Sequence, residues 1–285
     1  MGGFTTSDGV RIDYFTRGAG PPLLACQGGP ANISDTLAAS LAPLEDARTI
    51  VYHDYRGSGR SDSAPSDTYT YERMADDLDE LRHHLGYGPV PVLAHSMGGF
   101  IALNYALRHP QGCAGLVLVG TTPTGDPRKI AGPALRRLGP GRTAKMLGRA
   151  LWYLGAWAWR PESQGRRAAL YAIFATTQEG LPNTRARVKE ALAGIPAPND
   201  NVPHLERLFG RTDLTADLPR IACPVLLLYG DRDAVMAVGG RLLYANLKRA
   251  SRVVLPQVGH EPFLEAPDKA FPQVREFLAT PSGVT

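Results

Sequence analysis

This 285-residue chain has no long apolar run and no cysteine framework. The longest apolar stretch, Met146–Trp159, is interrupted by Arg149 and falls short of the roughly 20 residues that a membrane-spanning helix needs. The three cysteines, Cys26, Cys113 and Cys223, are odd in number and far apart, so they predict neither a disulfide framework nor a C-x-x-C metal site. We expect three buried structural thiols.

We also expect no secretory signal, because the first residues show no basic start followed by an apolar run. We therefore expect a cytoplasmic protein. With 44% hydrophobic and 20% charged residues, the composition is that of a globular domain and excludes a largely disordered chain. A chain of this length buries about three quarters of its unfolded surface, so a full core is available without staples.

The net charge of +4 is unevenly distributed. Residues 123–213 hold 15 Lys and Arg against 7 Asp and Glu, a surplus of +8, whereas the remainder carries −4. The arginines of this segment are scattered among apolar residues, with no basic and aromatic ladder and no nucleic-acid motif. We interpret them either as a solvated basic face or as a preference for anionic substrates or partners, and we expect no nucleic-acid ligand.

Short apolar runs alternate with helical patterns along the chain. From Tyr71 to Leu85, apolar residues recur every three or four positions, with acids early and histidines late, which predicts an amphipathic helix. Further helices are expected over Met97–Arg108 and Phe271–Leu278. The expected strands are Val10–Arg17, Pro22–Cys26, Arg48–His53, Val90–Ala94, Leu116–Val119, Val225–Tyr229 and Arg252–Leu255. This order predicts an α/β fold, a mostly parallel sheet with helices on both faces. The first of these strands partly alternates in polarity, as an antiparallel edge strand does.

Residues 123–213 interrupt this alternation. They contain no strand-like run and all three tryptophans, so we predict a helical cap inserted into a core of residues 1–122 and 214–285. The stretch Met146–Trp159 is apolar nearly all round, which is typical of a helix buried on several sides. A lid helix facing substrate and a helix lying on a membrane surface are the alternatives. We expect no stable membrane insertion.

The sequence Ala94–His95–Ser96–Met97–Gly98 follows an apolar strand and opens a helix. Such a turn projects the serine hydroxyl above the sheet, and small residues two before and two after are needed because the turn is tight. The positive end of the following helix suits developing negative charge. We therefore predict that Ser96 is a nucleophile, with the N–H of Met97 as one oxyanion donor. His95 points away and is expected to be structural.

A serine hydroxyl needs a base within hydrogen-bond reach and an acid that orients this base. Of the seven histidines, His260 alone follows a late strand within a loop, between Gly259 and Pro262. Loops at the carboxyl ends of parallel strands are where ligands meet such a sheet. For the acid, Asp231 and Asp233 both follow Val225–Tyr229. The alternative for Asp233 is that it only caps the next helix. Asp54 is expected to hold the turn that follows it.

Four blocks in this order resemble the α/β-hydrolase superfamily, over nearly the whole chain. They are Gln27–Gly28–Gly29–Pro30, Asp54–Ser61 (DYRGSGRS), Ala94–Gly98 (AHSMG), and Gly230–Asp233 (GDRD) with Gly259–His260. The first two look like those of the prolyl aminopeptidase branch, and the third resembles the variant elbow of some small bacterial lipases. The chain departs from the family pattern at Gln27, usually histidine, and at Ala94, usually glycine.

The resemblance implies a serine hydrolase with an eight-stranded sheet and a helical cap. It selects Asp233 as the acid beside Ser96 and His260, and Gly29 as the second oxyanion donor. No residue pattern specifies a metal or organic cofactor, and we expect none. The oligomeric state is left open.

We expect an ester, lactone or thioester hydrolase that acts on a mainly apolar small molecule through an acyl-enzyme. The alternatives are a prolyl-type aminopeptidase and a non-hydrolytic catalyst or receptor on the same fold, such as a cyclase or lyase. The basic surplus of residues 123–213 disfavours a cationic amine substrate.

Overall fold

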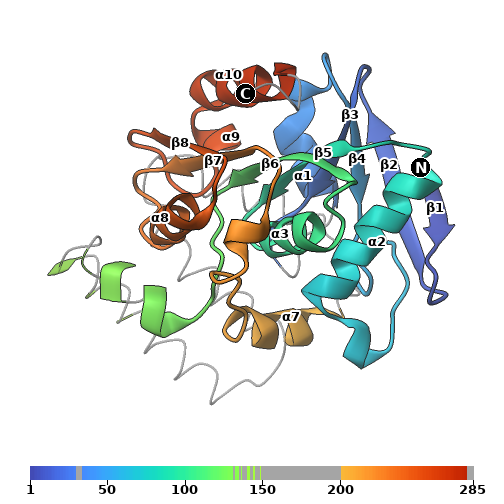
Figure 1. The fold of residues 1–285 in the computed structure, drawn as a ribbon, viewed down its shortest axis with the longest axis horizontal. Coiled ribbons are helices and arrows are strands. Elements are labelled where there is room, and N and C mark those ends of the chain that lie inside the picture. The colour runs from blue at the N-terminus through green and yellow to red at the C-terminus, as the bar shows by residue number, and fades with distance from the viewer. Residues whose placement is uncertain are drawn as a thin grey trace.

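Eight strands form one sheet in the order β1-β2-β4-β3-β5-β6-β7-β8 (Figure 1). The computed structural model describes residues 1–29, 34–130 and 200–280, together with residues 132–134, 136, 140, 141, 144 and 148. The strands are β1 (Gly2–Thr5), β2 (Arg11–Arg17), β3 (Pro22–Cys26), β4 (Thr49–His53), β5 (Val90–His95), β6 (Cys113–Val119), β7 (Val225–Gly230) and β8 (Ala250–Leu255). Strands β1, β2 and β4 pair antiparallel and the remaining pairs are parallel, which confirms the predicted α/β fold.

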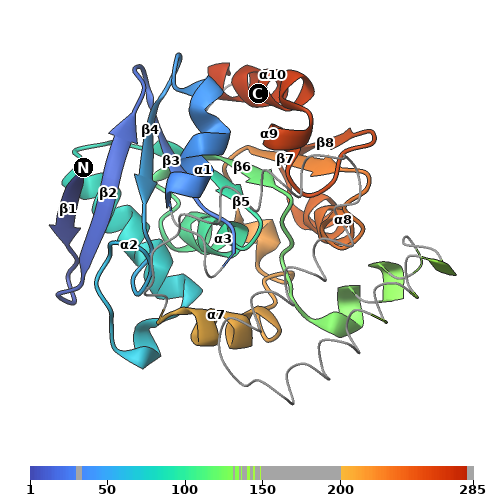
Figure 2. The same cartoon turned by 180° about the vertical axis from the view of Figure 1, so that it is seen from behind.

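Helices cover both faces of the sheet (Figures 1 and 2). The helices are α1 (Ser34–Leu41), η1 (Ala42–Leu44), η2 (Ser66–Thr68), α2 (Tyr71–His84), α3 (Gly98–Arg108), α7 (Val202–Phe209), η3 (Leu218–Arg220), α8 (Met236–Asn246), α9 (Pro262–Glu265) and α10 (Pro267–Ala279). Buried residues of α2, α3 and α8 form one core with strand residues such as Leu24. Those of α1, α9 and α10 form a second core with residues such as Leu23. Adjacent strand residues thus face opposite layers, as the period of two requires.

One expectation about the sheet is wrong. The strand predicted over Val10–Arg17 is antiparallel, but it is not at the edge, because β1 pairs outside it with Phe4 opposite Ile12. The partial alternation in polarity did not indicate an edge position, because both faces of β2 carry buried residues. The predicted helix over Phe271–Leu278 begins earlier, at Pro267, since proline is tolerated in the first turn of a helix.

The chain leaves the sheet after β6 and returns before β7. At this base, Thr124 and Asp213 form an isolated antiparallel bridge, and the N–H of Leu214 donates to the carbonyl of Pro123 at 2.9 Å. Most of the segment predicted as a cap lies outside the described residues, so the division into core and cap stays a prediction. At its far end, α7 lies beneath the sheet in Figure 1.

The apolar stretch Met146–Trp159 lies outside the described residues except for Gly148. Its three alternative interpretations therefore stay open. Elsewhere in the described part of the chain, no helix combines the length and the apolar character needed to cross a membrane.

A buried arginine connects the turn after β4 to α2. The Arg56 side chain is fully buried and forms two hydrogen bonds of 2.7 Å with the Asp77 carboxylate of α2. It also pairs with Asp8 at 2.9 Å. The carbonyl of Arg56 accepts a hydrogen bond from the side-chain amide of Asn201, where the described chain resumes. The Arg56 guanidinium therefore connects the turn after β4 to the β1–β2 loop through Asp8 and to helix α2 through Asp77.

We predict that Arg56→Ala destabilises the fold by about 3–5 kcal/mol, because it leaves the Asp77 carboxylate buried without its partner. Urea unfolding followed by circular dichroism measures the change. The matched control is Arg128→Ala, since the Arg128 side chain is 88% exposed in its ion pair with Asp126 and its loss should leave the unfolding midpoint unchanged. Equal midpoints for Arg56→Ala and the wild type would contradict the prediction.

Candidate active site

The carboxyl ends of the parallel strands meet at one edge of the sheet. Strand β3 lies between β4 and β5, so the connection from β3 runs to one side and the connection from β5 to the other. Ligands of open α/β sheets bind at such a switch point. The loop after β3 and the turn carrying Ser96 flank this point, and the loops after β7 and β8 carry Asp233 and His260.

Ser96 occupies a strained turn between β5 and α3. Its φ of 51° lies in the left-handed region, which few residues other than glycine adopt. The turn is held by the N–H of Ser96, which donates to the carbonyl of Val119 at 2.9 Å, and by the Thr121 hydroxyl, which donates to the carbonyl of Ser96 at 2.6 Å. A Cβ on Gly98 would lie 2.6 Å from the carbonyl oxygen of Cys26, so glycine is required there.

Three side chains form a hydrogen-bonded chain, which we call the Ser96–His260–Asp233 chain. His260 Nδ1 lies 2.6 Å from Asp233 Oδ2, and His260 Nε2 lies 3.0 Å from the Ser96 hydroxyl. With the proton on Nδ1, the ring donates to Asp233 and accepts from Ser96. The sequence singled out these three residues, which follow three different strands, and the structure brings their side chains into contact.

Asp233 has a second contact. Its Oδ1 accepts a hydrogen bond of 3.1 Å from the N–H of Met236 at the start of α8, while its Oδ2 faces His260. The carboxylate therefore caps the helix and orients the imidazole at once, two roles that the sequence treated as alternatives. Asp233 is 2% exposed, whereas Asp231 is exposed at the surface of the same turn.

Carboxylates control the protonation of His260. Its burial disfavours the imidazolium, but the charge and hydrogen bond of Asp233, with the charges of Glu261 and Glu265, outweigh this and raise the pKa of His260 to about 9. A weakly perturbed histidine would titrate near 6.5. Glu265 itself accepts hydrogen bonds from the N–H groups of Gly259 and Glu261, so it also shapes the loop that carries His260.

His95 extends this arrangement. Its Nε2 lies 3.0 Å from the carbonyl oxygen of His260, and the two rings are 4.8 Å apart. Burial lowers the pKa of His95, which favours a neutral ring that donates from Nε2 to this carbonyl. The sequence pointed to a structural role without a partner, because a contact across 165 positions leaves no local signal.

The same region contains a possible metal-ligand set. Ligand atoms of His95, His260 and Glu261 lie within 4.8 Å of one another. Both ring nitrogens of His260 already face Asp233 and Ser96, so a metal at this position would have to break the Ser96–His260–Asp233 chain. The cluster fits a hydrogen-bonded support for His260 better than a metal centre.

The predicted oxyanion donors, Gly29 and Met97, lie on either side of the turn that carries Ser96. A Cβ on Gly28 would lie 2.8 Å from Ser96 Cβ, so the loop after β3 packs directly against this turn. Gly29 follows with a φ of 70°, and Met97 begins the first turn of α3. Within residues 1–29, 34–130 and 200–280, no group accepts a hydrogen bond from the N–H of Gly29 or of Met97. The carbonyl of Gln27 accepts from the Tyr55 hydroxyl, which anchors the loop.

Asp54 differs from Asp233 in its hydrogen-bond partners. It is fully buried and accepts hydrogen bonds from the N–H and hydroxyl of Ser34 and from the N–H of Arg60. Its contacts thus hold the following turn and the start of α1, as expected from the sequence.

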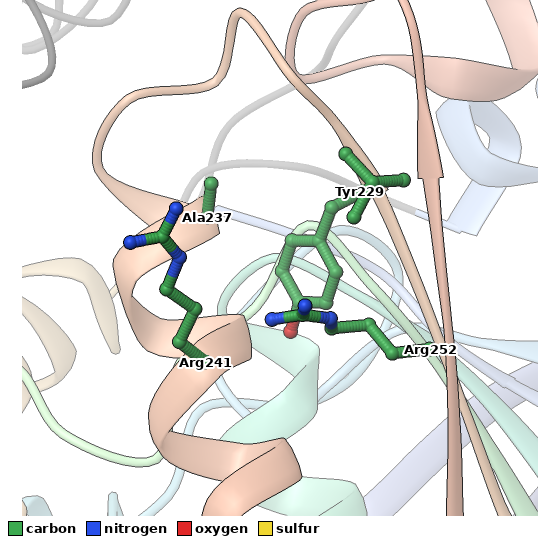
Figure 3. A pocket seen from close by; sticks show the side chains of 5 residues that line it. Tyr229, Ala237, Arg241 and Arg252 are labelled. Carbon is green, nitrogen blue, oxygen red and sulfur yellow. The ribbon is translucent and has the colours of Figure 1, made fainter.

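A separate pocket of about 130 Å³ lies between α8 and β8 (Figure 3). Arg241 of α8 and Arg252 of β8 approach it from opposite sides, next to the Tyr229 ring. Its lining includes no histidine and no carboxylate, so it lacks the groups that acyl transfer requires.

Comparisons with known proteins agree with the fold. Residues 21–139 match the family described as alpha/beta hydrolase fold. The chain is 31% identical to a pimeloyl-[acyl-carrier protein] methyl ester esterase of Chromobacterium violaceum, covering 93% of this chain and 97% of that protein. It is 27% identical to a proline iminopeptidase of Pestalotiopsis fici, over 96% and 98% of the two chains. The structure of a thermophilic esterase from Thermogutta terrifontis is also similar, with a TM-score of 0.73, 26% identity and coverage of 96% and 95%.

The chain belongs to the α/β-hydrolase fold family, and it is an enzyme of the hydrolase class. The similarity to a proline iminopeptidase confirms the resemblance found in the first two sequence blocks.

We predict that hydrolysis of a neutral ester depends steeply on pH above neutrality. If His260 is the base, it must be neutral to accept a proton, and a pKa of about 9 leaves it mostly charged at pH 7. The value of kcat/KM should therefore rise roughly tenfold per pH unit from pH 7 to 8 and level off near pH 9. Initial rates across this range, corrected for spontaneous hydrolysis, measure the profile.

The variant Glu261→Gln removes a charge that raises the pKa of His260, so its profile should shift to lower pH. Glu276→Gln, at an exposed position of α10, is the matched control and should leave the profile unchanged. A wild-type midpoint near 6.5 that does not move in Glu261→Gln would show that the carboxylates do not set this pKa.

Proposed function

We propose that this hydrolase cleaves an ester bond, or a related thioester or lactone, in a mainly apolar small molecule through an acyl-enzyme. The observation that supports this most is the Ser96–His260–Asp233 chain, with separations of 3.0 and 2.6 Å. A nucleophile, a base and an orienting acid in hydrogen-bond contact are what acyl transfer requires.

In the proposed acylation step, His260 Nε2 accepts the proton of Ser96 as the hydroxyl oxygen attacks the substrate carbonyl carbon. Asp233 stabilises the imidazolium that forms and keeps its ring oriented. The N–H groups of Gly29 and Met97 receive the negative charge that develops on the carbonyl oxygen. His260 then donates its proton to the leaving alcohol or thiol, and the acyl group remains on Ser96.

In the proposed deacylation step, water replaces the alcohol. His260 accepts a proton from the water as it attacks the acyl carbon, and then returns a proton to the Ser96 oxygen. The carboxylic acid leaves and the enzyme is restored. His95 holds the backbone carbonyl of His260 through both steps, so the ring keeps its position relative to Ser96.

We further propose that residues 123–213 form a cap that selects the substrate. Two observations support this division: the paired base at Thr124 and Asp213, and the concentration of basic and tryptophan residues between them. A field of +8 favours neutral or anionic acyl groups over cationic ones. The name of the relative from Chromobacterium violaceum, a methyl ester esterase that acts on an acyl-carrier protein derivative, agrees with an ester substrate.

We predict that Ser96→Ala lowers turnover on the order of a million-fold if the three residues act as a unit. A fluorophosphonate should label the wild type at Ser96, identified by mass spectrometry of the modified peptide, and should not label Ser96→Ala. Ser251→Ala, which removes an exposed hydroxyl on β8, should keep both labelling and activity. Turnover of Ser96→Ala within tenfold of the wild type would remove Ser96 from the mechanism.

A second candidate function is removal of an amino-terminal proline. It is favoured by the relative named as a proline iminopeptidase, which covers 96% of this chain. This reaction uses the same nucleophile but requires a site for a substrate ammonium group, which the positive field of residues 123–213 opposes.

We predict hydrolysis of aryl and acyl esters together with a low kcat/KM for a prolyl arylamide, measured under identical conditions. Esters carry better leaving groups, so the arylamide decides between the two functions. A prolyl arylamide kcat/KM above about 10⁴ M⁻¹s⁻¹, ordinary for a good enzyme and substrate pair, would establish the aminopeptidase. Inactivity on both substrates with Ser96 unlabelled would favour a non-hydrolytic catalyst or receptor.

A further inference from the structure

Two cysteines meet at the edge of the sheet opposite the candidate active site. Cys113 begins β6, and Cys223 lies two residues before β7. They are 110 positions apart in the chain, yet their sulfur atoms lie 3.6 Å from each other. Strands β6 and β7 pair directly, with Leu116 opposite Val225, so their amino-terminal ends are neighbours. The sequence spacing gave no reason to connect these thiols.

The two thiols differ in accessibility and acidity. Cys113 is 5% exposed, and its pKa is raised by the neighbouring Cys223 and by burial. Cys223 is only partly buried, and its pKa is lowered, first by the hydrogen bond from Cys113 and further by the charge of Arg249. An accessible thiol with a lowered pKa is the one that reacts with an oxidant, and a second thiol in contact then resolves the product.

We propose that Cys113 and Cys223 are a redox modification site, which a hydroperoxide converts to a disulfide that links the start of β6 to the segment before β7. A disulfide needs a sulfur separation of about 2.05 Å. The sulfurs at 3.6 Å therefore need to approach by a further 1.5 Å or so, a distance within reach of a side-chain rotation.

The chemistry balances with the hydroperoxide as the only co-reactant. The Cys223 thiolate attacks one peroxide oxygen, the O–O bond breaks, and Cys223 becomes a sulfenic acid as the other oxygen leaves as alkoxide or hydroxide and takes up a proton. The Cys113 sulfur then attacks the Cys223 sulfur and the S–O bond breaks, with the thiol proton leaving in the water released. Two sulfurs lose two electrons in total, and the peroxide gains them. A dithiol reverses the step by exchange.

The bond would act on the fold rather than on the reaction. Ser96, Asp233 and His260 follow the carboxyl ends of β5, β7 and β8, whereas the cysteines lie at the amino-terminal ends of β6 and β7. A disulfide at this position closes a loop that contains β6, the whole of residues 123–213 and η3. Closing a loop of this length restricts the unfolded chain and raises thermal stability.

The test compares the purified full-length protein before and after treatment with hydrogen peroxide. We expect a loss of two hydrogen atoms in intact mass, and a non-reduced peptide map that joins the Cys113 and Cys223 peptides. Cys26 serves as an internal standard, because it is fully buried and its pKa is raised to about 12, so it should stay reduced. The melting temperature should rise by roughly 5–15 °C and return after reduction with a dithiol.

The variants Cys113→Ala and Cys223→Ser are each compared with themselves, oxidised against reduced, so that a change in basal stability does not affect the outcome. For each variant, the oxidised and reduced forms should have the same melting temperature. Oxidation of Cys223 alone with Cys113 still alkylatable, a linkage through Cys26, or the absence of any modification would overturn the proposed pair. A disulfide that forms without changing the melting temperature would overturn its role in stability.

Discussion

Close packing around Ser96 is the constraint on which the rest of the site depends. Gly98 lies against the carbonyls at the end of β3, and a Cβ on Gly99 would overlap the Thr121 side chain after β6. Ser96 keeps its left-handed backbone conformation because these close contacts sterically exclude other conformations of the turn. Three neighbouring strands thus end at fixed positions relative to one hydroxyl.

Burial and nearby charges have opposite effects on the pKa of His260. His260 is removed from water, which alone would keep it neutral, yet three carboxylates around it favour the imidazolium. A histidine with a raised pKa is, in its neutral form, a stronger base than an ordinary imidazole. The nearby carboxylates also stabilise the imidazolium that forms when it accepts a proton. Arg56 shows the same balance far from the hydroxyl, since Asp77 and Asp8 compensate the burial of its guanidinium. In both cases the charges of neighbouring carboxylates offset the cost of burying a cation.

Much of this could be predicted from local patterns, and the failures have physical causes. The strand Pro22–Cys26 was predicted with its bounds because a buried strand is a short apolar run between turns. A helix after Asp233 was expected, but the bounds of α8 were not predicted, because Gly239 and Gly240 weaken the helical pattern, although a Cβ at either position would collide with Thr122 or Tyr229. The Cys113–Cys223 contact and the effect of Asp233 on the pKa of His260 depend on residues distant in sequence. Ser96 was chosen from its strand-to-helix turn, His260 from its loop after a late strand, and Asp233 from the family resemblance. Their side chains are in hydrogen-bond contact in the structure, while their roles and the cap are proposals.

The paired base between Thr124 and Asp213 has an evolutionary consequence. The chain exits and re-enters the sheet at one place, where a bridge and the hydrogen bond from Leu214 to Pro123 close the gap. Because the two ends of this segment are joined at one place, a change in its length need not separate β6 from β7. Under the proposed cap function, substrate preference could change through this segment alone, while the loops that carry Ser96, Asp233 and His260 stay as they are. The same junction offers protein engineers a natural place for grafting.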